Sequence, residues 1–284
     1  MNGFPMAESR LRRLIGSPAR IGLGGEGVLR TEGREQEAAA VLEAAYGAGI
    51  RYFDSAPAYA GSERYLGRFW QQHPARVADT FQTSKSARRD RGGAEADLRR
   101  TLDRLGRERL GLWQIHDLRT EADLRQLRDP GGAWQAFADA RDTGTVRGIG
   151  VTGHHDPSVL LEAVSHWDVD AVLLPVNPVE AVIGGFSDTV IPAARERGIG
   201  VIGMKTMGAA NFIFPDAGIL PGMLVRFALA QDTDLVIAGC STPAEARDLA
   251  AAAREGPLDG EEQSRLLGLF RPHARQLAFY RGVV

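Results

Sequence analysis

One pattern recurs along the chain: a short apolar run rich in Val and Ile is followed by a stretch whose apolar residues have helical spacing. The sequence predicts strands at residues 20–23, 50–54, 77–85, 110–116, 146–152, 170–174, 200–204 and 235–239. It predicts helices at 35–47, 62–69, 94–105, 134–142, 158–166, 190–197, 221–231 and 243–254, and one or two more between 261 and 280. Such alternation favours a parallel sheet covered by helices on both faces.

Eight strand–helix units in 284 residues indicate an α/β fold of the closed (β/α)8 TIM-barrel type, with a single domain over residues 1–284. A doubly wound open sheet is the alternative, and it would place a glycine-rich phosphate loop between the first strand and the first helix. Four glycines lie between residues 22 and 27, but the predicted helix begins only near residue 35. Residues 1–17 are expected to form a tail plus a short hairpin at the bottom of the barrel.

Composition argues against several classes of protein. The net charge is −2 and both signs are interspersed, so no nucleic-acid partner is expected. The chain has one cysteine, Cys240, which rules out an internal disulfide. No apolar run approaches the length of a membrane span, and the N-terminus lacks the apolar core of a signal peptide. We therefore expect a cytoplasmic protein that does not enter a membrane.

Four polar residues follow the ends of consecutive predicted strands. Asp54 ends the second strand, Tyr59 lies in the loop after it, and Lys85 and His116 end the third and fourth strands. The carboxyl ends of neighbouring strands meet at one mouth of a barrel, where such folds hold their active sites. We therefore expect these four side chains to converge. Ser62 is expected to cap the helix that follows Tyr59.

The chemistry of such a cluster favours carbonyl reduction. A buried lysine beside a phenol stabilises the phenolate, so we expect Lys85 to lower the pKa of Tyr59 while Asp54 holds the lysine charged. Tyr59 would donate a proton to a carbonyl oxygen, and a neutral His116 would hydrogen-bond the same oxygen. These groups cannot supply a hydride, which in enzymes usually comes from a nicotinamide cofactor.

The segment FDSAPAYAGSERYLG resembles the signature of the aldo-keto reductase family, and TSK and WQIHD resemble its lysine and histidine strands. The resemblance runs from about residue 20 to about residue 249. It implies a (β/α)8 barrel that reduces aldehydes and ketones with NAD(P)H and takes a small-molecule carbonyl substrate. It also implies that Asp54, Tyr59, Lys85 and His116 form the catalytic tetrad, with Tyr59 as the proton donor.

Further segments resemble the cofactor contacts of the family. RGIGVTGHH, VLLPVNPV, GVIGMKTMGAA and AGCSTPAEARDL resemble its fifth to eighth strands, and the glycines after the first strand would let backbone approach a ligand. Glu245 stands where the family has an arginine or glutamine, which disfavours the 2′-phosphate of NADPH and leaves the choice between NADP and NAD open. The expected cofactor contacts are Gly25, Thr152, Asn177, Met204, Lys205, Gly239, Ser241, Glu245 and Asp248.

Two other functions stay open. Gly153, Leu173 and Met204 replace residues with which the family usually contacts nicotinamide, so the barrel could serve as a cofactor-binding regulatory subunit with weak catalysis. An isomerase or dehydratase could use Tyr59 and Lys85 without a dinucleotide. No metal site is expected at His154-His155-Asp156, because no third ligand has recognisable spacing.

Overall fold

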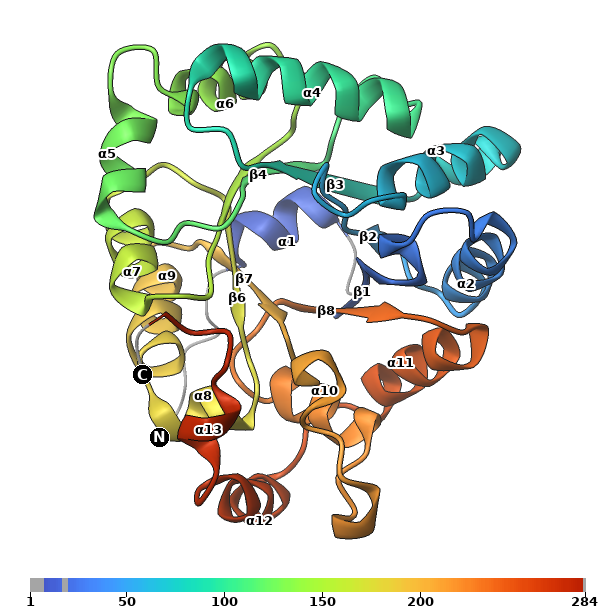
Figure 1. Cartoon of the computed structure of the whole chain (residues 1–284), viewed down its shortest axis with the longest axis vertical. Coiled ribbons are helices and arrows are strands. Elements are labelled where there is room, and N and C mark those ends of the chain that lie inside the picture. Colours follow the sequence, from blue (N-terminus) through green and yellow to red (C-terminus); the bar gives the residue numbers. More distant parts are fainter. Residues whose placement is uncertain (1–7, 17–19, 283–284) are drawn as a thin grey trace.

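Eight parallel strands close into a barrel in the order of the sequence, as the computed structural model of the chain shows (Figure 1). The structure describes residues 8–16 and 20–282. The strands are β1 (Ile21–Gly27), β2 (Tyr52–Phe53), β3 (Phe81–Ser86), β4 (Leu112–Ile115), β5 (Ile149–Thr152), β6 (Ala171–Pro175), β7 (Gly200–Met204) and β8 (Leu235–Cys240). Pairing of β1 with β8 closes the sheet, so the (β/α)8 prediction is confirmed and the open doubly wound alternative is wrong.

Helices surround the barrel, and three of the described helices follow β8 in the sequence (Figure 1). Those near the predicted ranges are α2 (Glu35–Gly47), α3 (Ser62–Gln72), α4 (Arg91–Leu105), α6 (Ala133–Asp142), α7 (Pro157–His166), α9 (Ile191–Glu196), α10 (Pro221–Leu229), α11 (Pro243–Glu255), α12 (Gly260–Phe270) and α13 (Ala274–Leu277). Three more were not predicted: α1 (Arg10–Ile15), α5 (Glu121–Arg128) and α8 (Pro178–Ile183). Each of these three has at most eight residues, too few for a clear apolar periodicity.

Four strands, β2 to β5, are shorter than the sequence suggested. β2 has only two residues, and β3 begins at Phe81 because a 3-10 helix (Pro74–Arg76) and a turn precede it. In that turn the Thr80 hydroxyl donates to the Val77 carbonyl, 3.0 Å away. A hydroxyl that bonds nearby backbone offers the chain an alternative to the sheet ladder, which is why residues 77–80 form a turn and not the predicted start of the strand.

Alternate strand residues pack in two apolar layers. One set fills the barrel lumen and includes Tyr52, Phe81, Leu112, Leu173 and Ile202. The opposite set faces the helices. Trp113 belongs to the outer layer and stacks on Phe137 of α6, with 3.7 Å between ring centroids. Trp113 therefore faces away from the lumen and packs under a helix.

Helix α1 closes the far end of the barrel in Figure 1. Its Leu11 is fully buried in the lumen cluster, where a Cβ on Gly200 would lie 2.2 Å from the Leu11 Cβ. Ser9 caps the helix by accepting from the Arg12 amide, and Gly16 ends it in the left-handed region. The predicted hairpin is therefore wrong at residues 10–15, and the rest of that prediction falls largely outside the described residues. Within the part of the chain that the structure describes, no helix has the length and apolar character needed to cross a membrane.

Candidate active site

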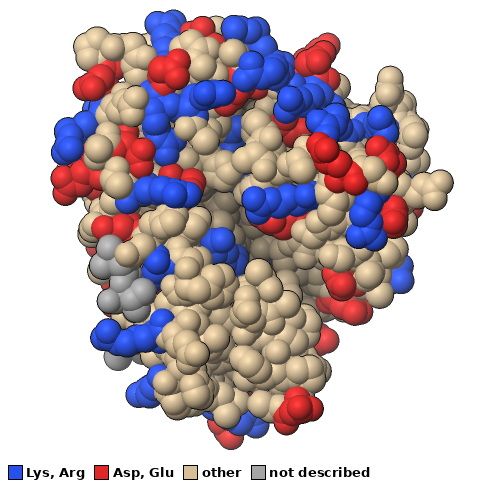
Figure 2. Space-filling model, in the orientation of Figure 1, with Lys and Arg blue, Asp and Glu red and all other residues tan. Residues whose placement is uncertain are grey.

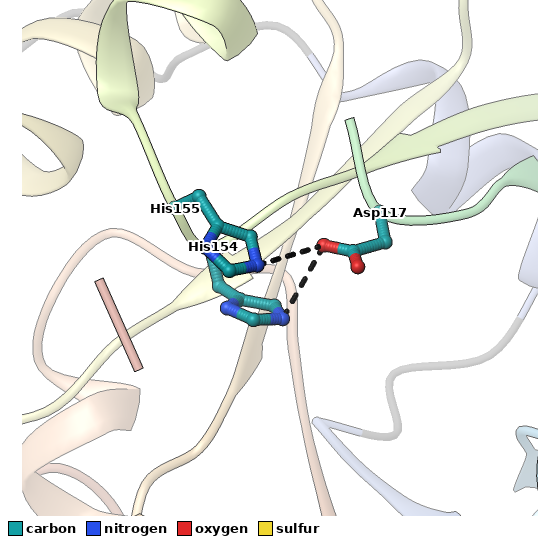
Figure 3. Close-up of side chains that lie close together, drawn as sticks. All are labelled: Asp117, His154 and His155. Atoms are coloured by element: carbon teal, nitrogen blue, oxygen red, sulfur yellow. Dashed lines mark ion pairs between the residues drawn. The ribbon is translucent and has the colours of Figure 1, made fainter. Parts of the chain in front are cut away.

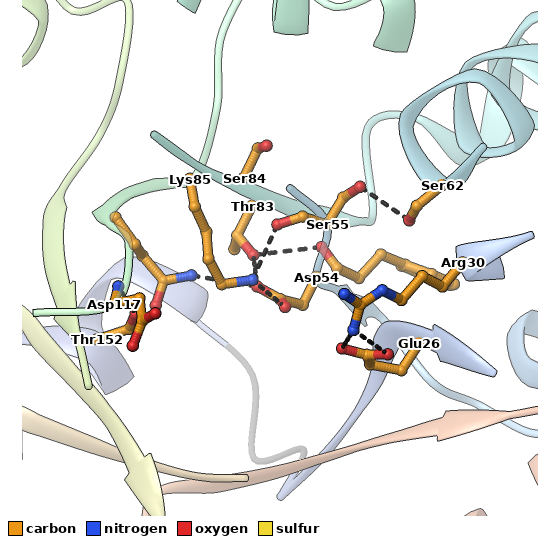
Figure 4. A network of polar contacts seen from close by, with 12 residues as sticks. Glu26, Arg30, Asp54, Ser55, Ser62, Thr83, Ser84, Lys85, Asp117 and Thr152 are labelled. Atoms are coloured by element: carbon orange, nitrogen blue, oxygen red, sulfur yellow. Dashed lines mark hydrogen bonds and ion pairs between the residues drawn. The ribbon is translucent and has the colours of Figure 1, made fainter. Parts of the chain in front are cut away.

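The carboxylate of Asp54 lies at the centre of a buried polar network just beyond β2 (Figure 4). It is 2% exposed and accepts hydrogen bonds from Lys85 Nζ, from the Thr83 hydroxyl at 2.8 Å and from Gln114 Nε2 at 3.1 Å. These donors come from β3 and β4, the strands that follow β2 around the barrel. A buried carboxylate with three donors is fixed in position and can hold a neighbouring cation in place.

Lys85 is buried beside Asp54, at 1% exposure, and its ammonium also donates to the Ser55 carbonyl at 2.9 Å. The nitrogen lies 4.7 Å from the centroid of the Tyr59 ring. Burial alone would lower the pKa of Lys85, but the charges of Asp54 and Tyr59 and the hydrogen bonds to both raise it above its ordinary value. Lys85 therefore remains a cation next to the phenol at any physiological pH.

Tyr59 lies in the loop between β2 and α3, half-buried, with its ring edge-on to His116. The two ring centroids are 5.6 Å apart and the planes are at 90°. Burial raises the pKa of Tyr59, Lys85 opposes this, and Asp54 and Glu26 add to it, so the net direction is upward. The expected lowering is therefore wrong for the protein without ligands, because desolvation and Asp54 outweigh the lysine. Tyr59 stays a neutral phenol, the form that can give up a proton.

His116 follows β4 and stays uncharged near neutral pH. Burial, and next the charge of Lys85, lower its pKa to about 3. A neutral imidazole can donate one hydrogen bond to a developing oxyanion without carrying a charge of its own. The expectation of a neutral imidazole beside the phenol is thus consistent with the structure.

Gly25 makes room for the phenol. A Cβ at this position would lie 2.8 Å from Tyr59 Cδ2, 2.8 Å from Ser62 Oγ and 2.9 Å from the Asp54 carbonyl. Ser62 does not cap α3 as predicted: the cap residue is Gly61, and Ser62 is buried, with its Oγ accepting from Ser55 Oγ at 2.8 Å. The sequence pattern of a cap was misleading because the hydroxyl faces the site rather than the first turn of the helix.

The predicted cofactor residues of β5 to β7 also lie at strand ends, but several already have protein partners. The Thr152 hydroxyl accepts from the Asp117 amide at 2.8 Å. Asn177 is 1% exposed and donates to the Lys205 carbonyl and to the Tyr280 hydroxyl, at 3.1 and 2.9 Å. Met204 ends β7 and is half-buried against the lumen cluster. The amide of Asn177 thus has a full set of partners within the chain.

Lys205 follows β7 with a backbone φ of 54°, and its ammonium lies 5.6 Å from the centroid of the Tyr280 ring. Burial lowers its pKa, and Glu26 and Asp117 oppose that shift. The ammonium of Lys205 therefore lies close enough to the carboxylates of Glu26 and Asp117 for their negative charge to stabilise it.

The predicted adenosine contacts lie where β8 joins α11. A Cβ on Gly239 would meet Glu26 Cβ at 2.6 Å, so β1 and β8 approach closely there. Thr242 caps α11, and the Glu245 carboxylate accepts from the Ser241 amide at 2.7 Å. Ser241, Glu245 and Asp248 are exposed, as solvent-accessible cofactor contacts would be. A carboxylate thus occupies the positive end of this helix.

Several residues around the tetrad were not predicted as functional. Thr83 and Gln114 hold Asp54, and both share a strand face with a tetrad member, which was a usable signal. Arg30 lies 5.4 Å from the centroid of the Tyr59 ring and pairs with Glu26 at 2.8 Å. That pair depends on the conformation of the loop after β1, which residue types alone do not specify. Figure 2 shows that the face seen in Figure 1 is hollowed near its centre, with basic side chains around the hollow.

Comparisons with known proteins identify the family of the chain. The model of the aldo/keto reductase family matches residues 20–212. D-threo-aldose 1-dehydrogenase of Pseudomonas sp is 30% identical over 202 residues, and the match covers 59% of this chain and 59% of that protein. Pyridoxal 4-dehydrogenase of Microbacterium luteolum is 25% identical over 277 residues, covering 81% and 79% of the two chains. The match to the first of these relatives therefore spans less than two thirds of its length.

Solved structures share the fold. The aldo/keto reductase of Brucella melitensis aligns with a TM-score of 0.69 at 19% identity, over 88% of this chain and 94% of that one. The aldo-keto reductase of Bombyx mori, solved in complex with NADP, aligns with a TM-score of 0.68 at 19% identity, over 87% and 88%. With the family match over most of its length and the closed barrel above, the chain belongs to the aldo/keto reductase family, whose members are NAD(P)-dependent oxidoreductases.

Proposed function

We propose that this oxidoreductase reduces an aldehyde or ketone to an alcohol, with Tyr59 as the proton donor. The observation that carries the proposal is that Lys85 contacts both Asp54 and the Tyr59 ring. The Tyr59 ring in turn lies edge-on to a neutral His116. The raised pKa of Tyr59 keeps the phenol protonated before reaction. Because the mechanism needs a proton donor and not a phenolate at the outset, this direction suits reduction.

The charge state of each residue sets its role in the reaction. A nicotinamide dinucleotide, when bound, would supply the hydride to the carbonyl carbon. As the C=O π bond breaks, the oxygen takes the electron pair and then the phenolic proton of Tyr59, which leaves a phenolate. The ammonium of Lys85 stabilises that phenolate, and Asp54 keeps the ammonium in place. His116 orients the oxygen through its N–H. Oxidation of the alcohol reverses each step.

For the cofactor, we propose that NADH binds more tightly than NADPH. Glu245 is exposed and its carboxylate already satisfies the Ser241 amide at the start of α11. A 2′-phosphate at this helix terminus would meet like charge and would compete for a donor that is already used. Exposed Arg247 is the nearest residue in sequence that could offset this charge.

Tyr59→Phe tests the mechanism. The variant keeps the ring and removes the proton, so it is expected to bind dinucleotide as the wild type does and to lose about 10²–10⁴-fold in turnover. Trp fluorescence is titrated with NADH and NADPH for both proteins, and a panel of aliphatic, aromatic and hydroxylated carbonyls is then assayed with the tighter cofactor.

Each outcome has a distinct meaning. Unchanged turnover by Tyr59→Phe would exclude Tyr59 as the donor. Tight cofactor binding without turnover across the panel would support a regulatory subunit, an alternative motivated by Gly153, Leu173 and Met204, which replace residues with which the family usually contacts nicotinamide. Failure of both dinucleotides to bind would favour an isomerase or dehydratase.

A further inference from the structure

We propose that Asp117, His154 and His155 form a binding site for one divalent transition-metal ion, with Zn²⁺ as the expected ion, at the mouth of the barrel. Figure 3 shows both imidazoles turned toward the same carboxylate oxygen. One candidate ligand atom from each of the three residues lies within 4.8 Å of the others. None of the three belongs to the proposed catalytic tetrad, although Asp117 directly follows His116.

The fold brings the three residues together from separate loops. Asp117 lies two residues past the end of β4 and His154 two residues past the end of β5, and these strands are paired. Asp117 Oδ1 lies 3.3 Å from His154 Nε2 and 3.7 Å from His155 Nε2. Neighbouring ligands of a tetrahedral ion with bonds of about 2.0–2.1 Å lie about 3.3 Å apart, so the spacing is close to that of a metal site.

The tautomer of His154 leaves a lone pair facing the carboxylate of Asp117. His154 Nδ1 lies 3.0 Å from the Tyr280 carbonyl, which can only accept, so Nδ1 carries the proton and Nε2 presents its lone pair to Asp117. Among the described residues, neither Asp117 Oδ1 nor His155 Nε2 has a hydrogen-bond partner, although both atoms are buried. A cation between these atoms would turn a repulsive arrangement into a favourable one.

The surroundings orient the carboxylate. Arg119 binds the Oδ2 atom at 2.6 Å, which leaves Oδ1 directed at the imidazoles. The Asp117 backbone has φ 58° and its amide donates to Thr152 Oγ1 at 2.8 Å, so the residue is held in the left-handed region. Such supporting contacts commonly position metal ligands.

The ligand set selects the kind of ion. Two imidazoles and one carboxylate suit Zn²⁺ and related transition metals, whereas Mg²⁺ and Ca²⁺ prefer oxygen ligands alone. Nearby Arg119 and Lys205 carry positive charge, which repels any cation. Mg²⁺ and Ca²⁺, which would be held mainly by charge, are therefore disfavoured more than Zn²⁺, which the imidazole nitrogens can coordinate. His155 also lines a surface hollow with Arg119, Glu121 and Ser158, which gives an ion a path from solvent.

The test measures binding rather than turnover. Tag-free protein is stripped with a chelator, dialysed into a non-coordinating buffer and titrated with Zn²⁺ in a calorimeter and with Co²⁺ in a spectrophotometer. We expect one ion per chain and the visible absorption bands of four-coordinate Co²⁺. His155→Gln and Asp117→Asn should each weaken Zn²⁺ binding at least tenfold. Asn tolerates a positive φ, so the loop conformation of Asp117 is retained.

His166→Gln is the matched control. His166 is exposed on α7 and pairs with Glu162 at 3.1 Å, so its loss removes a histidine–carboxylate pair elsewhere on the chain. Zn²⁺ binding should not change in this variant, and circular dichroism should show all four proteins folded. The proposal is overturned if the wild type binds no stoichiometric ion, or if the two site variants bind as tightly as the control. It is equally overturned if proton NMR shows a proton shared by Asp117 and the imidazoles at neutral pH in metal-saturated solution.

Discussion

Burial of His116 makes the stability of this protein depend on pH. The folded-state pKa is about 3, below the ordinary 6.5. Between these values the unfolded chain binds a proton that the folded chain does not, so stability falls as the pH falls from about 6.5 toward about 3. Above about pH 6.5 the residue is neutral in both states and contributes no pH dependence.

His116→Gln should therefore resist acid better than the wild type. Glutamine does not titrate, so the loss of stability on acidification should become less steep by up to about 1.4 kcal/mol per pH unit. Urea unfolding at a series of pH values between about 4 and about 8 measures the slopes of both proteins. Parallel slopes would show that His116 titrates normally in the folded state. Other groups, including His154, are common to both proteins and cancel in the difference.

At the same scale, residue type and strand position were enough to predict that Lys85 meets Asp54, because the ends of consecutive strands must converge in a barrel. Thr83 and Gln114, which also bond Asp54, were not predicted. The direction of the Tyr59 pKa shift was not predictable in that way. It depends on how deeply the phenol is buried and on whether Asp54 neutralises Lys85, and both are tertiary quantities. Asp117 and His154 occupy equivalent positions after neighbouring strands, so their proximity was open to the same reasoning.

At the scale of elements, closure of the barrel depends on the contact of β1 with β8. Gly27 has φ 67°, and a Cβ there would lie 2.4 Å from the Cys240 carbonyl oxygen. Cys240 itself is buried, and burial raises its pKa to about 12, so it takes part as a neutral packing residue. Two effects therefore exclude a side chain at Gly27. The backbone of β8 leaves no room for it, and the positive φ is unfavourable for any residue with a Cβ.

Gly27→Ala and Gly33→Ala separate these two effects. Gly33 has φ 70° but nothing lies within 4 Å of its Cβ position. Gly33→Ala should cost about 1–2 kcal/mol for the left-handed backbone alone. Gly27→Ala should cost a further 1–3 kcal/mol, roughly, because β1 and β8 must move apart. Urea unfolding of both variants measures the difference, and equal costs would mean that the strands adjust freely.

The prediction of helices succeeded where the helix was long and its apolar residues were regularly spaced. The helix Glu35–Gly47 has the predicted bounds because Ala38, Val41, Leu42 and Ala45 form one buried stripe. Six-residue α1 carries a single fully buried residue, Leu11, and its role as a plug arises only once a lumen exists to receive it. Short elements whose stability comes from tertiary contacts are the ones that sequence periodicity misses.

At the scale of the whole molecule, the C-terminal segment ties three parts of the barrel mouth together. Arg281 pairs with Glu180 of α8, and the exposures of the two side chains are 4% and 0%. Tyr280 bonds Asn177 and His154, and the Gly282 amide donates to the His155 carbonyl at 3.2 Å. Burial raises the pKa of Glu180 even though Arg281 opposes the shift, so the carboxylate depends on its partner to remain charged.

Arg281→Met should release this segment rather than unfold the chain. Breaking a buried ion pair typically costs about 3–5 kcal/mol because the remaining charge is left uncompensated. Detaching the last few residues lets Glu180 reach water and avoids much of that cost, and local opening of this kind is measurable by hydrogen exchange. The Gly282 amide should therefore exchange much faster in the variant, while amides in β3 and β4 keep their protection.

Two further variants identify the cause. Glu180→Gln combined with Arg281→Met removes both charges and should restore part of the protection at Gly282, because no buried charge remains. Arg125→Met breaks an exposed pair with Glu121, with side-chain exposures of 70% and 82%, and should cost less than about 0.5 kcal/mol. If the double variant exchanges as fast as Arg281→Met, the segment is held by the contacts of Tyr280 and by packing, and the ion pair is not what anchors it. Since Tyr280 also holds His154 and Asn177, release of the segment should in addition weaken Zn²⁺ binding at the proposed site, which links the chain terminus to the barrel mouth.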